Sequence, residues 1–208
     1  IVLSHAHIDH SGNIPGIVKQ GFAGPVYCTP ATKDLAEVML ADSAHIQVRD
    51  AEYLNKKNRR IGEPPVEALY TPGDAAEAAD LFSAIPYHKP TGILPGITVT
   101  FSDAGHIIGS ATVVLTIVAK GKKTVLGFTG DLGPDNLPIV RDPEFMGNVE
   151  LLISESTYGG KKHEMTDDRE EHIRADLVRT IGRGGKIIMP AFSVGRTQNI
   201  IFTLHKLR

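Results

Sequence analysis

The stretch Ser4-His5-Ala6-His7-Ile8-Asp9-His10-Ser11-Gly12 decides how this sequence is interpreted. It directly follows an apolar run and places three histidines and one aspartate, all strong metal-ligand types, within six positions. Side chains at i and i+2 lie on the same side of an extended chain, so His5 and His7 can converge on one ion. Asp9 and His10 can then turn toward a second ion nearby. Imidazole nitrogens and carboxylate oxygens suit zinc, with iron or manganese as alternatives.

Two later segments repeat the arrangement of an apolar strand followed by a ligand residue among glycines. One is Phe101–Ser110, which contains His106, and the other is Val125–Gly133, which contains Asp131. Glycines let the backbone adopt positive φ and approach a bound group closely. Each segment alone, like a histidine-rich stretch alone, is compatible with an ordinary polar turn. Together the three form an ordered set of ligand types, which favours a metal centre.

The composition is that of an ordinary globular protein. Of 208 residues, 41% are hydrophobic and 22% charged, and 22 Lys plus Arg against 24 Asp plus Glu give a formal net charge of −2. These values exclude a disordered or collagen-like chain and argue against a uniformly basic nucleic-acid binder. The single cysteine, Cys28, excludes a disulfide framework and is expected to be a small buried hydrophobe. No apolar run approaches the roughly 20 residues that cross a bilayer, so we expect no membrane association.

Short apolar runs alternate with helical stretches along the chain, which predicts an α/β fold. Strands are expected at Ile1–Leu3, Val26–Cys28, Ile97–Ser102, Thr112–Val118, Thr124–Thr129, Leu151–Ser154 and Lys186–Met189. Helices are expected at Ile14–Gln20, Ala31 to about Arg59, Asp74–Ala84, Asp168–Ile181 and Arg196–Leu207. Gly121 predicts a hairpin turn, and Gly62–Gly73 is expected to be a surface loop.

The ligand motifs resemble those of a known family. His5-Ala6-His7-Ile8-Asp9-His10, then His106, then Asp131, look like the second, third and fourth motifs of the metallo-β-lactamase superfamily. The resemblance implies an αββα sandwich with two zinc ions at one edge. It assigns His5, His7 and His106 to the first zinc ion and Asp9 and His10 to the second, with Asp131 bridging both. An apparent departure is Pro134, where a basic or polar residue is expected.

Downstream residues indicate a branch of that superfamily. Glu150–Gly159, which contains Glu-Ser-Thr-Tyr-Gly, is similar to motif A of the β-CASP nucleases, in the spelling of the RNA-processing branch. Gly184–Gln198 looks like the entry into the inserted cap domain of that family. The resemblance divides the chain into residues 1–190, the metallo-β-lactamase core, and residues 191–208, the start of a β-CASP cap. We expect a piece of a longer protein, truncated at both ends, with the general-acid histidine and the last zinc ligand beyond residue 208.

The resemblance also implies catalytic roles. Asp9, Asp131 and the ions they hold would generate hydroxide near neutral pH, and Glu155 would orient the general-acid histidine. Ser193 and Arg196 are candidate substrate contacts, because a helix N-terminus can hold a phosphate, although an arginine there is equally compatible with simple solvation. The basic run Lys56–Arg60 and the pair Lys161–Lys162 could steer an RNA backbone, or could be solvated surface charges.

The function that this resemblance implies is a zinc-dependent ribonuclease, an endonuclease with 5′-to-3′ exonuclease activity left open, in RNA processing or mRNA 3′-end maturation. The expected partner is single-stranded RNA, the expected location is the cytoplasm, and a homodimer of the full-length protein is left open. Two alternatives remain at this point. One is a small-molecule metallo-hydrolase such as a glyoxalase II-like thioesterase, and the other is a catalytically inactive paralogue that serves as a scaffold.

Overall fold

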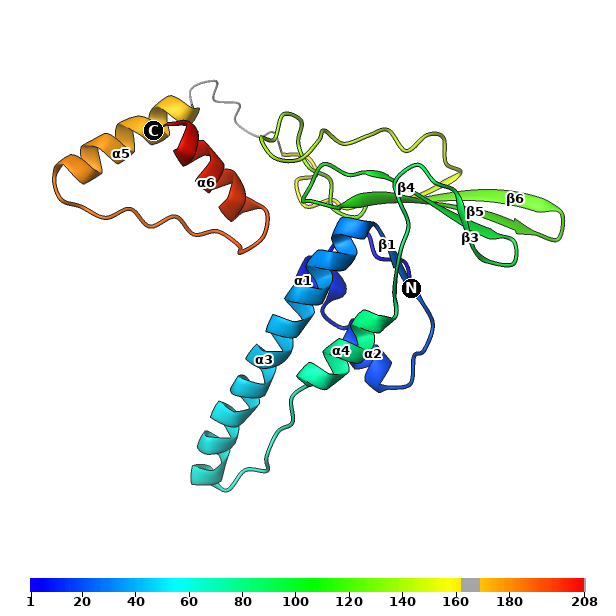
Figure 1. Cartoon of the computed structure of the whole chain (residues 1–208), viewed down its shortest axis with the longest axis horizontal. Coiled ribbons are helices and arrows are strands. Elements are labelled where there is room, and N and C mark those ends of the chain that lie inside the picture. The colour runs from blue at the N-terminus through cyan, green and yellow to red at the C-terminus, as the bar shows by residue number, and fades with distance from the viewer. Residues whose placement is uncertain (162–168, 208) are drawn as a thin grey trace.

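The structure is a computed structural model that describes residues 1–161 and 169–207 of the chain. Within these residues a five-stranded sheet and a two-stranded sheet are combined with helices, so the predicted α/β class is confirmed (Figure 1). In chain order the described elements are α1 (Ile8–Ser11), α2 (Ile14–Lys19), β1 (Val26–Cys28), α3 (Pro30–Ile61), α4 (Pro72–Asp80), β2 (Phe82–Ala84), β3 (Thr91–Leu94), β4 (Ile97–Asp103), β5 (Ala111–Ala119), β6 (Lys122–Phe128), β7 (Leu151–Ile153), α5 (Arg169–Gly182) and α6 (Arg196–Lys206). None of these helices is both long enough and apolar enough to span a bilayer.

The larger sheet has the strand order β3-β4-β5-β6-β7. Its first four strands are antiparallel neighbours, and β7 runs parallel to β6. The alternation expected over Ile97–Ser102 is confirmed, because Val99 and Phe101 are fully buried while the residues between them are partly exposed. Gly121, with a φ of 73°, lies in the turn between β5 and β6, as expected for a hairpin glycine.

The smaller sheet includes residues that were predicted to be helical. Its strands β1 and β2 pair in parallel, with Val26 opposite Phe82. The helix expected over Asp74–Ala84 is therefore too long, because α4 ends at Asp80 and β2 follows it. Val26 and Phe82 are both buried, so their tertiary pairing overrides the helical pattern of this alanine-rich segment.

The N-terminal run Ile1–Leu3 is extended, but the strand expected there is reduced to one isolated bridge, between Val2 and Tyr27. Leu3 N donates to Tyr27 O at 2.8 Å, and Tyr27 N donates to Ile1 O at 2.9 Å. These bonds fix the run against β1, and the buried Leu3 side chain faces the helices. The backbone just before the histidine-rich stretch is therefore held by hydrogen bonds to β1.

The long helix α3 agrees with the expected span of Ala31 to about Arg59. Thr29 caps its first turn by accepting a hydrogen bond from Thr32 N, and Pro30 occupies the first position, where no N–H is needed. Gly62, with a φ of 77°, ends it in the left-handed conformation. Its fully buried residues recur at four-residue spacing along one face, namely Thr32, Ala36, Leu40 and Ala44.

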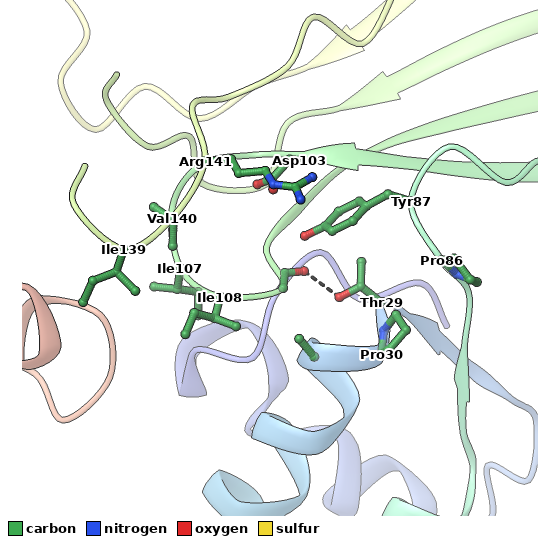
Figure 2. A pocket seen from close by; sticks show the side chains of 12 residues that line it. Thr29, Pro30, Pro86, Tyr87, Asp103, Ile107, Ile108, Ile139, Val140 and Arg141 are labelled. Atoms are coloured by element: carbon green, nitrogen blue, oxygen red, sulfur yellow. Dashed lines mark hydrogen bonds between the residues drawn. The ribbon is translucent and has the colours of Figure 1, made fainter. Parts of the chain in front are cut away.

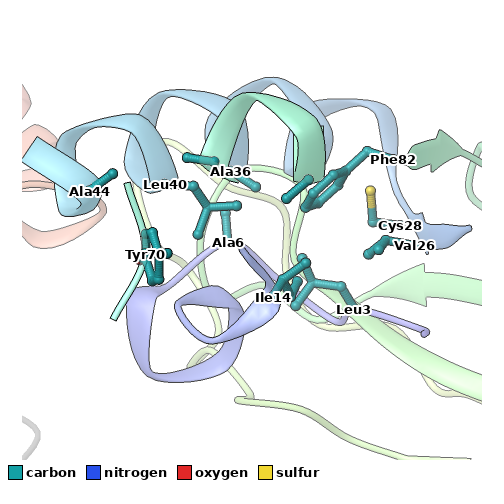
Figure 3. Packing of buried hydrophobic residues seen from close by; sticks show 12 residues of the cluster. Leu3, Ala6, Ile14, Val26, Cys28, Ala36, Leu40, Ala44, Tyr70 and Phe82 are labelled. Carbon is teal, nitrogen blue, oxygen red and sulfur yellow. The ribbon is translucent and has the colours of Figure 1, made fainter. Parts of the chain in front are cut away.

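Buried apolar side chains form two clusters. The first lies between α3, α4, the N-terminal run and the small sheet, and Figure 3 shows Leu40, Tyr70 and Phe82 among its residues. The second lies on one face of the larger sheet and contains Val99, Phe101, Ala111 and Val113. Of the metal-ligand candidates, Asp9 and His10 lie in α1, and the other four lie outside the helices and strands.

One strand predicted in the C-terminal part of the chain is not formed. The strand expected at Lys186–Met189 is wrong, because these residues lie outside any strand and Ile188 is 91% exposed. A strand needs a neighbour for its backbone groups, and no described strand lies beside this segment. Helices α5 and α6 agree with prediction to within a residue or so. Asp168, the expected start of α5, and Lys162 lie outside the described residues.

Cys28 is the expected small buried hydrophobe. Its side chain is fully buried in the first cluster, and burial raises the pKa of its thiol to about 12. Because the thiolate is the reactive form, we expect no measurable reaction with a thiol-specific disulfide reagent at pH 8 until the chain is unfolded in guanidinium. Rapid labelling of the native protein, measured by the absorbance of the released thiolate, would contradict this placement.

Candidate metal centre

The structure brings together the ligand candidates from all three sequence motifs. His5 and His7 precede α1, His106 lies in the loop between β4 and β5, and Asp131 follows β6. One ligand atom from each of these four residues lies within 4.8 Å of the others. The residues are separated by up to 126 positions in the chain, so their convergence is a property of the fold. The expected grouping of these four residues is therefore seen in the structure.

Asp131 faces two groups of histidines with its two oxygens. Oδ2 lies 3.7 Å from His5 Nε2 and 3.5 Å from His106 Nε2, whereas Oδ1 lies 3.2 Å from His10 Nε2. Asp9 is less enclosed: its carboxylate lies 3.7 Å from His10 Nε2 and its side chain is 75% exposed. Asp9 and His10 lie in the short helix α1, which the sequence does not predict, and this turn directs His10 toward Asp131.

The donor atoms of this cluster fit a metal ion. Among the described residues, the Nε2 atoms of His5 and His7 are buried and have no hydrogen-bond partner. A buried unsatisfied nitrogen is costly unless an ion or another group binds it. His5 Nδ1 is within hydrogen-bond distance of Ser4 Oγ at 3.1 Å, which orients the ring and leaves Nε2 facing the cluster. Imidazole nitrogens combined with one carboxylate are a donor set that zinc accepts.

The electrostatics of the cluster keep its histidines in the form that binds metals. Burial, followed by repulsion from His10, His106 and His7, lowers the pKa of His5 to about 2. Burial also lowers the pKa of His106, as does His7, while Asp131 acts in the opposite direction. Both imidazoles are therefore neutral at pH 7. Neutral imidazole is the species that donates a lone pair to a metal, so no deprotonation is needed at these residues.

The loop that carries His106 is held by hydrogen bonds to its backbone. Ser110 Oγ accepts from the N–H groups of His106 at 3.0 Å and Ile107 at 3.2 Å. Ser110 is fully buried, so these bonds are shielded from water. Nothing in the sequence motifs predicts this role for Ser110. Its position at the end of a glycine-flanked loop is the only signal that could have indicated such a role.

The same loop is also held by the start of α3. The Gly109 carbonyl accepts from the hydroxyls of Thr29 at 2.6 Å and Thr32 at 2.7 Å. Figure 2 draws the Thr29 bond beside a cavity of about 390 Å³ that Tyr87 and Arg141 help to line. Gly109 has a φ of 84°, and a side chain there would collide with the α3 backbone. The helix N-terminus and the ligand loop therefore form one rigid unit.

A second glycine contact joins the His106 loop to the Asp131 loop. Gly133 N donates to Ala104 O at 2.9 Å, and the Gly133 Cα packs directly on the Gly105 carbonyl. Any Cβ at position 133 would overlap that carbonyl. Pro134, the departure noted in the sequence, lies just beyond this contact and is exposed. This close backbone contact between Gly133 and Gly105 sets the distance between the His106 loop and the Asp131 loop.

Glu155 contacts the Asp131 loop directly. Its Oε1 accepts a hydrogen bond from Leu132 N at 2.7 Å, and its own N–H donates to Thr129 Oγ1 at 3.2 Å. Hydrogen bonds from the Leu132 N–H, and then from Thr157, hold the pKa of Glu155 below its usual value against the effect of burial. The carboxylate is therefore ionised near neutral pH. The sequence predicts a role for Glu155 toward a histidine and does not predict the Leu132 contact.

The segment that contains the candidate substrate contacts Ser193 and Arg196 already makes hydrogen bonds within the chain. The Ser193 carbonyl accepts from Gln198 Nε2 at 2.8 Å, and the Gly195 N–H at the start of α6 is bonded to Gln198 Oε1 at 2.7 Å. A cavity of about 450 Å³ adjoins both His106 and this segment, with Leu35 and Val38 of α3 in its wall. Arg196, the first residue of α6, follows this capped glycine.

The basic run Lys56–Arg60 lies far from the metal-ligand cluster. It forms the last turns of α3, whose first turn holds the His106 loop. A helix rises 1.5 Å per residue, so the 27 residues from Thr32 to Arg59 span about 40 Å. The two ends of α3 therefore lie on distant parts of the molecule (Figure 1). This run makes no contact with the cluster.

Comparisons with known proteins agree with the geometry. The ribonuclease TTHA0252 of Thermus thermophilus is 32% identical over 205 residues, which are 99% of this chain and 42% of that protein. Transcription termination factors FttA of Methanosarcina mazei and Thermococcus kodakarensis are 33% and 35% identical over 210 and 214 residues, 99% of this chain and 30% of each factor. The chain spans less than half the length of these relatives.

The family model of the metallo-beta-lactamase superfamily matches residues 1–171, which include every ligand candidate and the strand β7. The match agrees with the order of the three ligand motifs and with their convergence in the structure. The expectation drawn from the histidine-rich stretch is confirmed, and the chain belongs to the metallo-β-lactamase superfamily.

Proposed function

We propose that this chain is the metal-binding core of a ribonuclease of the β-CASP branch that hydrolyses RNA phosphodiester bonds. The observation that carries the proposal is the orientation of Asp131, with one oxygen toward His5 and His106 and the other toward His10. A carboxylate in this position suits a pair of ions. The relatives named as a ribonuclease and as transcription termination factors support RNA processing as the setting.

The proposed ligand assignment places one zinc ion near each carboxylate oxygen of Asp131. His5, His7 and His106 would hold one zinc ion, Asp9 and His10 would hold the other, and Asp131 would offer a carboxylate oxygen to each. The unpartnered Nε2 of His5 and the 3.1 Å approach of His7 Nδ1 to His106 Nε2 support the first group. The 3.2 Å approach of His10 to Asp131 supports the second, in which the exposed Asp9 leaves room for a further ligand.

The proposed chemistry uses bound ions and positioned side chains. When bound, a pair of divalent ions lowers the pKa of a water and neutralises charge on a phosphate. Asp131 and Asp9 would balance the positive charge, and the neutral imidazoles of His5 and His106 would donate lone pairs without releasing protons. Glu155, ionised near neutral pH, would orient the group that protonates the leaving oxygen. No serine or cysteine nucleophile is required.

Substrate binding is proposed for the segment that starts the cap. The cavity of about 450 Å³ beside His106 has room for a nucleotide of a single-stranded RNA next to the reacting phosphate. Val194 and Gly195, which lie between Ser193 and Arg196 in the chain, line this cavity, and Arg196 would bind a phosphate oxygen. We further propose that residues 1–190 form the catalytic core and residues 191–208 begin the cap, in a cytoplasmic protein that can form homodimers.

The test is hydrolysis of labelled single-stranded RNA by the full-length protein, before and after removal of metal with a chelator. We expect cleavage to stop on chelation and to return with added zinc, because the histidine cluster has no other group that activates water. Elemental analysis should find two zinc ions per chain. Cleavage that survives chelation, or none at all, would refute the proposal, and hydrolysis of a glutathione thioester instead would indicate the thioesterase alternative.

A further inference from the structure

Glu155 bonds directly to the peptide group that follows Asp131 and, through the Thr129 hydroxyl, is linked to the peptide group that precedes it. Its Oε1 accepts from the N–H of Leu132, the residue after Asp131, at 2.7 Å. Its backbone N–H donates to Thr129 Oγ1 at 3.2 Å, two residues before Asp131. The same Thr129 hydroxyl donates to the Gly130 carbonyl at 2.8 Å. Residues 129–132 are therefore tied to Glu155 at both ends.

These bonds begin where the strand ladder stops. β6 and β7 pair in parallel up to Phe128 opposite Ile153, and Thr129 N still donates to Ile153 O at 3.0 Å. Gly130, with a φ of 55°, then turns the chain away from the sheet. Beyond that turn the ladder cannot supply partners for the backbone. The Glu155 side chain supplies one, so the Asp131 loop remains attached to β7.

The Leu132 N–H belongs to the peptide group bonded to the Asp131 Cα. The Thr129 hydroxyl holds the preceding peptide group through the Gly130 carbonyl, and with the peptide groups on both sides held, φ and ψ of Asp131 and the direction of its Cα–Cβ bond are set. At 2.7 Å the bond is short for an N–H donor and a carboxyl oxygen, so it holds the peptide group closely. A free loop would let the carboxylate turn away from His10 or from His5 and His106.

We propose that Glu155 is a positioning residue that holds the Asp131 carboxylate between its two groups of histidines by binding the Leu132 N–H. This inference rests on the proposed role of Asp131 as a metal ligand and adds a cause for its orientation. The contact requires an acceptor oxygen at position 155 and does not require a negative charge. If Glu155 acted only through its charge on His106 or the ions, a negative charge would be required at position 155 and the hydrogen bond to Leu132 would not.

The test compares Glu155→Ala with Glu155→Gln in the full-length protein, because glutamine keeps an acceptor oxygen and loses the charge. We measure zinc affinity by competition with a chromophoric chelator, and the visible spectrum of the cobalt-substituted protein as a report on ligand geometry. Loss of a residue that orients a ligand costs about 10- to 100-fold in metal affinity. We expect such a loss, with an altered cobalt spectrum, for Glu155→Ala. Glu155→Gln should retain the wild-type spectrum and most of the affinity.

Glu150→Ala is the matched control. Glu150 Oε1 accepts from Val125 N at 3.3 Å, so it makes the same kind of bond to β6 at the far end of the β6–β7 pair. We expect wild-type zinc affinity and spectrum from this variant. Thermal unfolding of the metal-free proteins identifies any variant that fails to fold.

Three results would overturn the inference. They are unchanged zinc affinity in Glu155→Ala, equal losses in Glu155→Ala and Glu155→Gln, and an equal loss in Glu150→Ala. Equal losses in Glu155→Ala and Glu155→Gln would mean that the charge of Glu155 sets the zinc affinity. An equal loss in Glu150→Ala would mean that general weakening of the β6–β7 pair lowers it. Failure of the proposed function is distinguishable, because a wild-type protein that binds zinc but leaves RNA intact refutes the ribonuclease proposal while the zinc and cobalt measurements still test Glu155.

Discussion

Replacing Asp131 by alanine is expected to lower RNA cleavage by at least ~10³-fold, because the loss of bridging removes several kcal/mol of charge stabilisation from the transition state. The carboxylate is the only described acidic group that approaches both sets of histidines, at 3.2 Å from His10 and 3.5 Å from His106. Its removal should also reduce bound zinc below two ions per chain. Cleavage of labelled RNA and elemental analysis of the purified variant measure both effects.

The fold should survive this change. The Asp131 side chain is 30% exposed and lies outside both apolar clusters, so its truncation opens no buried cavity. The circular dichroism spectrum and the unfolding transition of the metal-free variant should match those of the wild type. Asp135→Ala, an exposed carboxylate in the same loop, is the control and should keep both zinc ions and activity. A fully active Asp131→Ala protein would refute the bridging assignment.

Replacing Gly133 by alanine is expected to damage both stability and the metal centre. The added Cβ would overlap the Gly105 carbonyl, and because backbone meets backbone, neither loop can relax by rotating a side chain. Overpacking typically costs 1–3 kcal/mol and occasionally more, and we expect about 3 kcal/mol here. The Asp131 and His106 loops would separate, so zinc affinity should fall with stability. Denaturant unfolding and zinc competition measure the two losses.

Gly182→Ala is the control for this change. A Cβ at Gly182, the last residue of α5, meets no atom within 4 Å. Alanine is also the better helix former, so stability should not fall. If Gly133→Ala bound zinc as tightly as the wild type and unfolded at the same denaturant concentration, the close loop crossing could not be what sets the distance between the two ligand loops.

The strand and helix predictions succeeded where a local pattern was strong. The alternation over Ile97–Ser102, the hairpin glycine Gly121 and the span of α3 all depend on near neighbours in sequence. They failed where a distant partner decides the structure. Residues 82–84 became β2 because Val26 lies beside Phe82, and Lys186–Met189 remained outside any strand because no described strand lies beside it.

The identities of the metal-ligand candidates were already determined by the sequence. Imidazole and carboxylate groups are recognisable residue types, and their i and i+2 spacing after an apolar run restricts where they can point. Their family follows from the order of the three motifs, and the family match confirms it. None of this depends on knowing which loops meet in space.

What holds those ligands in place was decided only by the tertiary structure. The Gly109 carbonyl is bound by Thr29 and Thr32, which lie 80 and 77 residues away, and the Leu132 N–H is bound by Glu155, 23 residues away. Each of these contacts ends on a backbone group, which every residue possesses and which therefore leaves no signature in the sequence. Ligand chemistry is a property of side chains and can be read locally, whereas ligand position depends on backbone partners that only folding brings together.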